Sequence, residues 1–307
     1  MIKSSTHKIL VIKHGALGDI TFSLDAMYSI RLHFKDSKIF LLTEKKFKNL
    51  LEKSKYFDEI ISDDRAGFIN SLKILNKLII KRFDLVIDLQ NSKRTNIYNF
   101  FLRYISKSII NSNRSNANFK YHIKPKGTES PKTGLNKQIN LLGIKTVVDK
   151  YKWLNVNTRI NDYKNLILVI PSTSKSGKYR QWPIKNFIDL CIKLEHYGKR
   201  ICLIGTKNDK NIINDIIKNC KNALDFTDKS PPEIIFSIAQ NCELIITNVT
   251  GPGHVAELSR NKIVWLAIND QYTKINIQNN KSNIKIVSDR IENITVEEVF
   301  NKIKEIL

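Results

Sequence analysis

Short apolar runs alternate with segments of helical periodicity along almost all of the 307 residues. The predicted strands lie at residues 8–12, 38–43, 58–61, 84–89, 166–170, 200–204, 243–247 and 262–267. The predicted helices lie at residues 22–34, 66–81, 93–105, 136–143, 184–197, 208–219, 232–241 and 295–306. The strands are rich in Ile, Leu and Val and alternate little, which is typical of a parallel sheet covered on both faces. The repeated strand–helix–strand order therefore predicts an α/β fold.

Two polar stretches interrupt this pattern. Residues 112–135 hold two prolines and two glycines, and we expect a mobile loop that borders a substrate cleft. Residues 155–165 precede a fresh apolar strand, and we place the domain boundary there, between residues 158 and 159. The chain is long enough for two domains, each with its own core.

Several classes of protein are disfavoured by the composition. No apolar run approaches the roughly 18–20 residues that span a bilayer, and the N-terminus lacks the apolar core of a signal peptide, so we expect a cytoplasmic protein. The four cysteines show no CxxC spacing and are expected to be buried, reduced thiols: Cys191, Cys202, Cys220 and Cys242. The acids form no Asp-x-Asp pair, only Asp63-Asp64, so no tightly held metal is implied.

The formal net charge of +22 indicates an anionic partner. The cations are spread along the whole chain and form no nucleic-acid-binding module, so we expect no nucleic acid partner. An anionic membrane surface fits better, at about 1 kcal/mol for each basic residue that approaches it. Charge alone does not decide the matter, because an A/T-rich codon bias would also enrich Lys, Asn and Ile.

Two glycine-containing loops each follow a predicted strand and open a helix. The first is KHGALGD at residues 13–19, and the second is TGPGH at residues 250–254. In a doubly wound sheet, ligands bind beyond the carboxyl ends of the strands, where both loops would lie. Asp19 is either an acid that stabilises the start of a helix or an acid directed at a substrate. The N–H groups at the second helix start suit a phosphate, and His254 either adds a donor or packs within the fold.

A third loop, PSTSKSGKYRQWP at residues 171–183, follows the strand at 166–170. Its hydroxyl groups and its cations Lys175, Lys178 and Arg180 suit a diphosphate, and a solvated basic loop is the alternative. This loop and the loop at 250–254 would lie on the same edge of the second sheet. That placement favours one shared anion site.

In their order along the chain, these motifs resemble those of glycosyltransferase family 9, the heptosyltransferase family of bacterial lipopolysaccharide assembly. The resemblance rests on ILVIKHGALGD, YFDEII, FDLVIDLQNSKR, KQINLLGI, IPSTSKSGKYRQWP, ICLIGTKND and TNVTGPGHVAEL. It is strongest toward the branch common in alphaproteobacteria. It implies a GT-B architecture, in which two Rossmann-like doubly wound domains face each other across a cleft. The acceptor domain would be residues 1–158, and the nucleotide-sugar domain would be residues 159–307.

The resemblance also implies roles for individual residues. Asp19 corresponds to the proposed catalytic base of the family. The implied donor-binding residues are Thr173, Ser174, Arg180, Thr250, Gly251, Gly253 and His254, and the implied acceptor-binding residues are Gly18, Gln90, Lys93 and Arg94. The implied donor is a nucleotide-sugar, ADP-linked by the family default, and no metal or other cofactor takes part. The implied acceptor is an anionic glycolipid at the cytoplasmic face of the inner membrane.

The chain departs from the family pattern at two places, both on the donor side. Val249 stands where the family usually has Asp, and WLAINDQYTKI at residues 265–275 replaces a glycine-containing turn followed by Thr or Ser. Two functions are therefore open: an inverting glycosyltransferase, or a non-catalytic nucleotide or sugar-phosphate binding protein on the same scaffold. The presence of Asp19, Arg180 and His254 together favours the enzyme.

Overall fold

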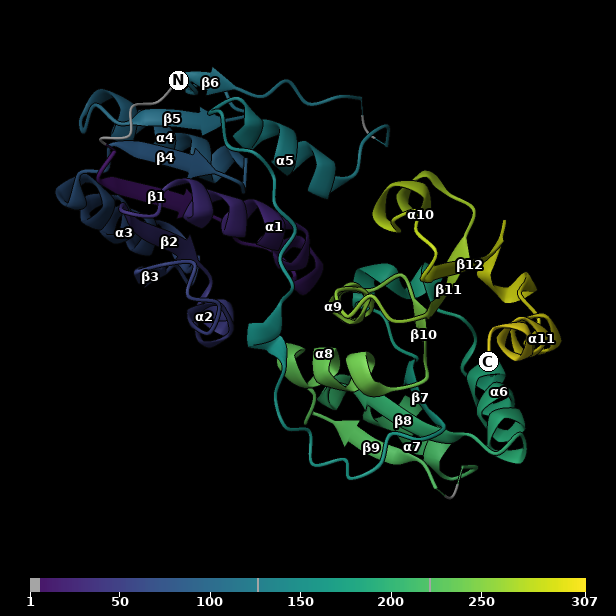
Figure 1. Ribbon diagram of the computed structural model, residues 1–307. Coiled ribbons are helices and arrows are strands. Elements are labelled where there is room, and N and C mark those ends of the chain that lie inside the picture. The colour runs from purple at the N-terminus through teal and green to yellow at the C-terminus, as the bar shows by residue number, and fades with distance from the viewer. Residues whose placement is uncertain (1–5, 126, 221) are drawn as a thin grey trace. The chain divides into compact units, whose positions relative to one another are not determined.

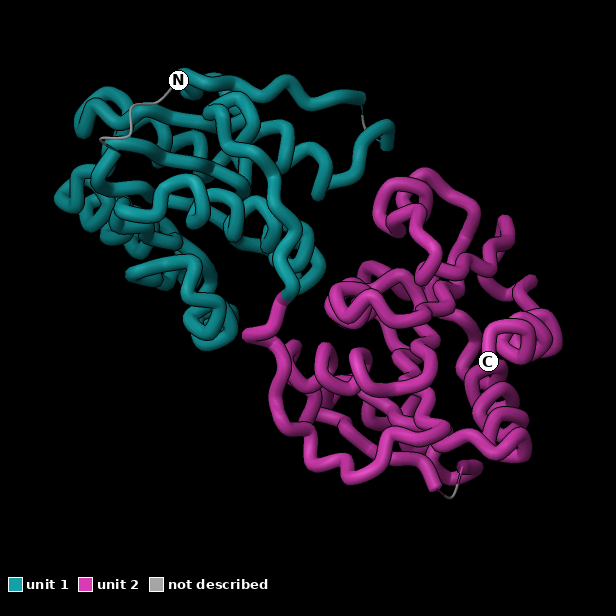
Figure 2. The backbone as a smooth tube through the Cα atoms, in the orientation of Figure 1, with its two compact units in different colours: residues 1–150 teal, residues 151–307 magenta. Residues whose placement is uncertain are grey.

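The computed structural model describes residues 6–125, 127–220 and 222–307, which form two compact units (Figures 1 and 2). Residues 1–150 make up unit 1 and residues 151–307 make up unit 2. The division thus falls after residue 150, earlier than the boundary after residue 158 that the polar stretch predicted. The intervening segment is attached to unit 2, because the Val156 N–H donates to Ser237 Oγ at 2.8 Å and that hydroxyl donates to the Leu154 carbonyl at 3.2 Å.

Unit 1 is built on a six-stranded parallel sheet in the order β3-β2-β1-β4-β5-β6. The strands are β1 (Lys8–Ile12), β2 (Lys38–Thr43), β3 (Glu59–Ser62), β4 (Leu85–Asp88), β5 (Ile109–Ser112) and β6 (Phe119–Lys120). In the register, Ile9 of β1 lies opposite Ile39 of β2 and Leu85 of β4. The order reverses between β1 and β4, and this reversal is the switch point at which doubly wound sheets bind ligands.

Helices cover both faces of this sheet. They are α1 (Leu17–His33), α2 (Lys45–Glu52), α3 (Gly67–Lys81), α4 (Lys93–Tyr104) and α5 (Pro131–Asn140). Helix α1 packs against α5, and α3 packs against α4 (Figure 1). Leu10 and Val86 of the central strands pack with Leu78 of α3 and Leu102 of α4 in one apolar core.

Unit 2 repeats this architecture with the order β12-β11-β10-β7-β8-β9. Its strands are β7 (Leu166–Ile170), β8 (Arg200–Gly205), β9 (Leu224–Thr227), β10 (Leu244–Asn248), β11 (Ile263–Ile268) and β12 (Asn283–Ser288). Its α-helices are α6 (Ile184–His196), α7 (Lys210–Ile217), α8 (Pro232–Asn241), α9 (Gly251–Glu257), α10 (Gln271–Asn276) and α11 (Val296–Ile306). Numbered within the unit, the strand order is the same as in unit 1, and the switch point lies between β7 and β10.

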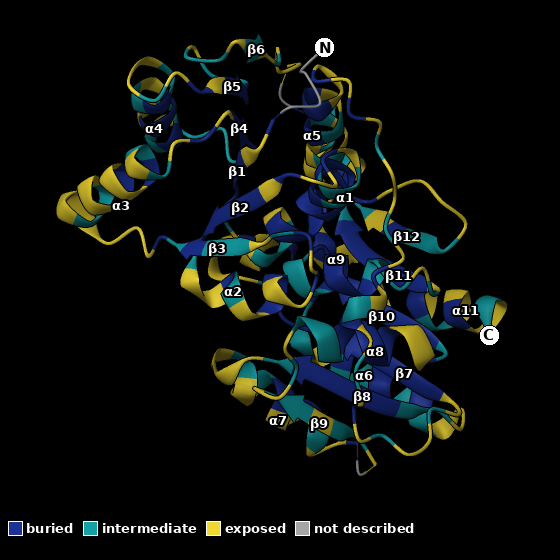
Figure 3. Cartoon of the chain, turned by 60° about the vertical axis from the view of Figure 1, so that its left-hand side comes forward, coloured by how far each residue is buried: buried dark blue, intermediate teal, exposed yellow. Residues whose placement is uncertain are grey.

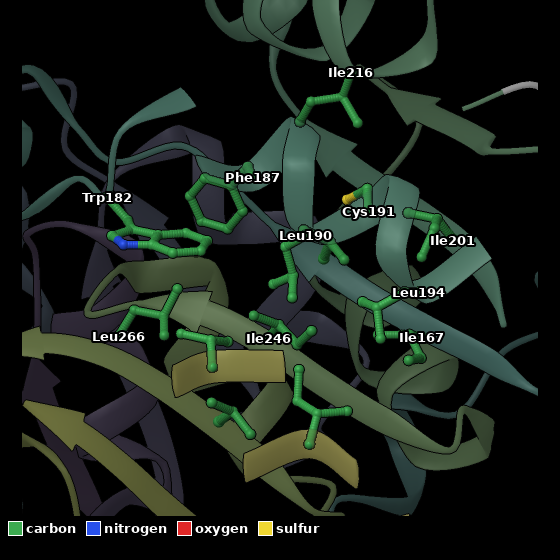
Figure 4. Close-up of a cluster of buried hydrophobic side chains, with 14 of the residues drawn as sticks. Ile167, Trp182, Phe187, Leu190, Cys191, Leu194, Ile201, Ile216, Ile246 and Leu266 are labelled. Atoms are coloured by element: carbon green, nitrogen blue, oxygen red, sulfur yellow. The ribbon is translucent and has the colours of Figure 1, made fainter. Parts of the chain in front are cut away.

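The core of unit 2 is organised around Trp182 and Phe187, whose ring centroids lie 5.0 Å apart (Figure 4). Trp182 is fully buried, and its indole N–H donates to the Ile294 carbonyl at 2.8 Å, so its polar atom is satisfied. The four cysteines are free thiols and buried, as expected. Within the described residues, no helix is both long enough and apolar enough to cross a membrane.

The α/β class and the two doubly wound domains are confirmed, whereas several elements differ from the prediction. The elements that the pattern did not reveal are β5, β6, β9, β12, α2 and α10, whereas α9 opens at the second glycine-containing loop as predicted. The first helix begins at Leu17 rather than at residue 22. Residues 112–135 were expected to form a loop, but they include β6 and the start of α5. This segment is held together because Glu129 accepts hydrogen bonds from Tyr121 and Lys137.

Candidate functional site

In each unit, the predicted site residues follow the two strands that flank the switch point. Asp19 follows β1, and Gln90, Lys93 and Arg94 follow β4, which is the parallel neighbour of β1. In unit 2, residues 173–180 follow β7 and residues 250–254 follow β10, again two parallel neighbours. Carboxyl ends of parallel strands meet at one sheet edge, so each unit gathers its candidate residues at the place where this fold binds ligands.

Asp19 stabilises the start of its helix, which is one of the two interpretations of its loop, and its role toward a substrate stays a prediction. It is the third residue of α1, and its Oδ2 accepts the Ala16 N–H at 2.8 Å, which satisfies a donor at the helix start. The residue is nevertheless exposed, and its Oδ1 has no hydrogen-bond partner within the described residues. Asp19 therefore holds its own helix start with one oxygen and leaves the other available for a proton. Gly18, the preceding residue of α1, is half-buried.

The conformation of the Asp19 loop depends on Gly15. Its φ of +118° is one that side chains disfavour, and a Cβ there would lie 2.5 Å from Asp19 Oδ2. The Gly15 N–H donates to Glu44 Oε1 at 3.2 Å, and the His14 N–H donates to Gln90 Oε1 at 3.0 Å. Bonds from two neighbouring strand ends thus fix the loop. In this structure, Gln90 positions the Asp19 loop, and its contact with an acceptor stays a prediction.

A buried lysine lies close to the same loop. Lys13 is 8% exposed, and its Nζ donates to the Leu89 carbonyl at 3.2 Å. Burial lowers the pKa of Lys13, and the nearby charges of Asp19 and Asp88 partly offset that effect. Burial also raises the pKa of Asp88, whose Oδ1 accepts the Gln90 N–H at 3.0 Å and so shapes the turn into α4. The amino group of Lys13 is thus buried close to Asp19 and Asp88.

Arg94 is paired within unit 1. Its Nη2 lies 2.8 Å and 3.0 Å from the two carboxylate oxygens of Asp63, and its Nε donates to Tyr98 Oη at 2.9 Å. Asp63 is fully buried, with His14 Nε2 at 3.5 Å. This pairing leaves Lys93, the exposed first residue of α4, as the more available of the two predicted acceptor cations. An open pocket of about 400 Å³ lined by Glu44, Lys45, Lys46 and Asp64 also lies in this unit.

In unit 2, Arg180 has the most informative surroundings. It ends a short 3-10 helix, η2 (Lys175–Arg180), and is 8% exposed. Its guanidinium carbon lies 3.9 Å from the ring centroid of Tyr272 and 5.1 Å from that of Tyr179. Its Nε and Nη1 are buried, with no hydrogen-bond partner among the described residues. A buried cation with unused donors is costly in free energy, so this arrangement suits an anionic ligand.

Other residues of the loop at 171–183 lie close to Arg180. A Cβ on Gly177 would lie 3.3 Å from Arg180 Nη2 and 3.3 Å from Thr173 Cβ, so the absence of a side chain there makes room for the guanidinium. The Thr173 hydroxyl donates to Gln181 Oε1 at 3.3 Å. Ser174 is exposed, and its hydroxyl lies 3.1 Å from that of Ser176. Thr173, Ser174 and Arg180 are thus brought together as predicted from the sequence.

The loop at residues 250–254 opens α9. Thr250 is the residue before the helix and Gly251 is the first residue within it. Gly253 is buried, and a Cβ there would come within 2.9 Å of Thr247 and Trp265, so its glycine is required for packing on β10 and β11. His254 is 2% exposed, with Nδ1 3.3 Å from Glu257 Oε2 and its ring 5.2 Å from that of Trp265. The packed state of His254 is therefore the one observed, and its contact with a phosphate stays a prediction.

Asn248 connects the loop at 171–183 to the end of β10, directly before the loop at 250–254. It is fully buried at the end of β10; its Oδ1 accepts the Trp182 N–H at 2.8 Å and its Nδ2 donates to the Pro171 carbonyl at 3.0 Å. These bonds fix Pro171 at the start of the loop at 171–183 and Trp182 near its end. Val249, the next residue, is 1% exposed. The side chain at the family's usual Asp position is thus almost completely buried in this chain.

A model of glycosyltransferase family 9 (heptosyltransferase) matches residues 130–288. The chain belongs to this family. The matched range includes Thr173, Arg180 and the loop at 250–254 but begins after Asp19 and Arg94. The assignment of the acceptor-side residues therefore rests on their motif and on their position at the switch point. A search of curated protein sequences finds no match.

Solved structures show the same fold. A family 9 glycosyltransferase from Veillonella parvula is 18% identical with a TM-score of 0.79, and the alignment covers 98% of this chain and 97% of that one. The ADP-heptose lipopolysaccharide heptosyltransferase II of E. coli is 16% identical with a TM-score of 0.76, covering 97% and 98%. The E. coli heptosyltransferase WaaC with ADP-2-deoxy-2-fluoro heptose is 14% identical with a TM-score of 0.75, covering 97% and 99%. The chain thus has the two-domain GT-B fold of this glycosyltransferase family.

Sequence reasoning missed several residues that shape these sites. Tyr272 lies in the segment where the chain departs from the family, and nothing in that segment indicated a contact with Arg180. Asp63 was noted only as half of an acidic pair, and Lys13 is one of 51 basic residues. Only the position of Asn248 was indicated by the sequence, because this residue ends an apolar strand directly before the loop at 250–254.

Proposed function

We propose that this family 9 glycosyltransferase transfers a heptose, with inversion, from an ADP-linked donor to an anionic glycolipid of the lipopolysaccharide-core type. The donor is proposed because the E. coli family member WaaC was solved with an ADP-heptose analogue. The acceptor is proposed from the family and from the net charge of +22. On this proposal, the enzyme acts at the cytoplasmic face of the inner membrane.

The observation that carries the donor half is the environment of Arg180. A guanidinium that is 8% exposed, with two unused donors at a switch point, is suited to a diphosphate. Tyr272 covers the guanidinium at 3.9 Å, so a ligand must displace this ring or shift the neighbouring loop to reach both donors. Thr173 and Ser174 add hydroxyl groups beside it.

The observation that carries the acceptor half is the exposed carboxylate of Asp19. In the proposed reaction, Asp19 takes the proton of the acceptor hydroxyl as that oxygen attacks the anomeric carbon of the sugar. The bond between the anomeric carbon and the diphosphate breaks in the same step, and ADP leaves with the electron pair. Arg180 stabilises the charge that develops on the leaving diphosphate. One displacement from the opposite face inverts the anomeric centre.

The test begins with calorimetric titration of ADP, UDP, GDP and ADP-heptose into the purified protein. We expect ADP and ADP-heptose to bind more tightly than the other two nucleotides. Turnover is then measured as ADP release with ADP-heptose and lipopolysaccharide-core acceptors, with Asp19→Asn as the matched inactive control. Equal affinity for all three nucleotides would contradict the ADP-linked donor.

The non-catalytic alternative makes a different prediction in the same experiment. A binding protein would bind a nucleotide and release no product with any nucleotide-sugar or acceptor in the panel. If donor binding needs the family's Asp, the buried Val249 in its place favours this alternative. Turnover that depends on Asp19 would exclude it.

A further inference from the structure

The outer surface of α3 and α4 is unusually apolar. Both helices carry exposed residues (Figure 3). Eight of the seventeen exposed large hydrophobic side chains in the described part of the chain lie on these two helices and the residue after α4. They are Phe68, Ile69, Leu72, Ile80, Ile97, Phe100, Tyr104 and Ile105, which we call the α3–α4 face. Single exposed apolar residues are ordinary, but a concentration of this kind marks an interaction surface.

On α4, the apolar residues form the outermost ridge of the helix. Ile97, Phe100 and Tyr104 recur at spacings of three and four residues, so they lie on one side. The buried residues lie on the other side: Thr95, Tyr98, Asn99 and Leu102. The rings of Phe100 and Tyr104 are 4.9 Å apart, and these residues are 46% and 51% exposed. The part of a surface helix that is normally most polar is here aliphatic and aromatic.

Helix α3, which packs against α4, also carries exposed apolar residues. Phe68 and Ile69 in its first turn are 76% and 70% exposed, and Leu72 in the next turn is 48% exposed. The buried residues Ile74, Leu75 and Leu78 are sufficient to attach α3 to the core. The exposed apolar residues are therefore additional to those that hold the helix in place.

The charge of these helices is of one sign. Their sequences contain six cations and no acid: Lys73, Lys77, Lys81, Lys93, Arg94 and Arg103. Arg94 and Lys81 pair with acids outside the helices, whereas Lys73 and Lys77 are exposed and have no ion pair among the described residues. The apolar surface thus has unneutralised lysines beside it.

We propose that the α3–α4 face docks this enzyme onto the surface of an anionic lipid bilayer. Apolar and aromatic side chains enter the boundary between head groups and acyl chains, and lysines beside them contact anionic head groups. A second copy of the chain fits this face less well, because pairing two such faces brings cations together without any acid from either helix. The inference rests on the proposed function only in taking the acceptor to be a glycolipid. Helix α4 begins at Lys93, at the sheet edge where the Asp19 loop lies, so docking through α4 would bring such an acceptor toward that edge.

The test is co-sedimentation of the full chain with vesicles of phosphatidylethanolamine and phosphatidylglycerol, and with vesicles of phosphatidylcholine alone. We expect binding to the anionic vesicles only, weakened by added salt. The variant Ile97→Ser/Phe100→Ser/Tyr104→Ser should bind at least tenfold more weakly. Its control is Ile123→Ser/Leu141→Ser, at two exposed apolar positions of the same unit outside the face, which should bind within about twofold of the parent.

The contribution of charge is tested separately. Lys73→Gln/Lys77→Gln should weaken binding by roughly fivefold for each lysine. The control Lys207→Gln/Lys218→Gln removes two exposed lysines of unit 2, with side chains 85% and 74% exposed. It should leave binding nearly unchanged. Circular dichroism shows whether each variant is folded, so that lost binding can be assigned to the surface.

Three results would overturn the proposal. One is absence of parent binding to the anionic vesicles, and another is unchanged binding of the folded ridge variant. The third is a dimer of the parent that becomes a monomer on substitution of the ridge, since the face would then be a contact between two copies. The vesicles contain neither donor nor acceptor, so these outcomes are independent of transferase activity. A protein that binds the anionic vesicles but shows no transferase activity would refute the proposed reaction and leave the docking proposal intact.

Discussion

Replacing Arg180 by Ala should weaken the binding of diphosphates far more than that of the nucleoside. Nε and Nη1 of this side chain are buried and unused, so a diphosphate gains up to two charge-assisted hydrogen bonds that adenosine cannot form. One such bond contributes about 1.5–3 kcal/mol. Displacing the Tyr272 ring from the guanidinium costs about 0.5–2 kcal/mol, which offsets part of a second bond. Counting the first bond alone, the expected net loss is at least about 1.5–3 kcal/mol.

This free energy corresponds to a 10- to 160-fold weaker dissociation constant for ADP. Calorimetric titration of ADP and adenosine into the parent protein and the Arg180→Ala variant measures it directly. Adenosine should bind both proteins within about twofold, because it has no phosphate to contact the guanidinium. The matched control is Lys185→Ala, which removes an exposed cation of α6 outside the loop at residues 171–183 and should change ADP binding little.

The variant Arg180→Lys separates charge from geometry. Lysine keeps a positive charge but lacks the planar set of donors, so it should recover only part of the affinity for ADP. Full recovery would indicate that charge alone attracts the ligand. If Arg180→Ala weakened ADP and adenosine by the same factor, the assignment of Arg180 to the diphosphate would be refuted, because the loss would then reflect a disturbed loop.

Three further predictions concern single residues. Asp19→Asn should lower turnover by about 10²–10⁴ while ADP affinity and thermal stability stay near those of the parent, because an amide oxygen can still accept the Ala16 N–H; near-normal turnover would exclude Asp19 as the base. Burial raises the pKa of Asp63, but hydrogen bonds from His14 and Arg65 and the charge of Arg94 outweigh it and hold the pKa below its ordinary value. Stability from Asp63 is therefore fully present above the ordinary Asp pKa of about 3.9 and is lost as the pH falls through the lower pKa of the folded state, so Asp63→Asn should cost about 2 kcal/mol in urea melts at pH 7 and progressively less as the pH is lowered below about 4; a cost that did not fall with pH would contradict the ion pair. Val249→Asp should reduce the free energy of unfolding by at least about 2 kcal/mol without tightening ADP-heptose binding, because the side chain is 1% exposed; a gain in affinity at unchanged stability would show that the site needs the family's acid.

The parts of the fold that the sequence predicted are those buried on both sides. Strand β7 is LILVI with every residue buried, and a continuous apolar run of this kind has few alternatives to a central parallel strand. The missed strands are short or only partly buried; β9 has no buried residue, and β6 has two residues. Helices α2 and α10, of eight and six residues, are shorter than the window of about 11–18 residues over which helical periodicity can be recognised.

The candidate sites were predictable to the extent that they follow from topology. Glycine and hydroxyl-rich loops after strands β1, β7 and β10 are local features, and the parallel sheet brings them to the switch points. The contacts that define each side chain are not local. Arg94 meets Asp63 across 31 positions, and Asn248 meets Pro171 across 77. Nothing in either residue's sequence neighbourhood specifies its partner.

Each of the two departures from the family pattern adjoins a residue that restrains Arg180 or its loop. Tyr272 lies in the divergent segment, and its ring covers Arg180, the cation whose diphosphate contact the family motif implies. Val249 directly follows Asn248, which holds the start of the Arg180 loop through Pro171. If the donor site had simply decayed, Arg180 would have lost its restraints. Instead, Tyr272 packs on its guanidinium, Gly177 makes room for it and its loop start is fixed. An acid at position 249 would have to be buried beside this assembly. On the proposed function, these restraints on Arg180 favour a donor site that has been retained over one that has been lost.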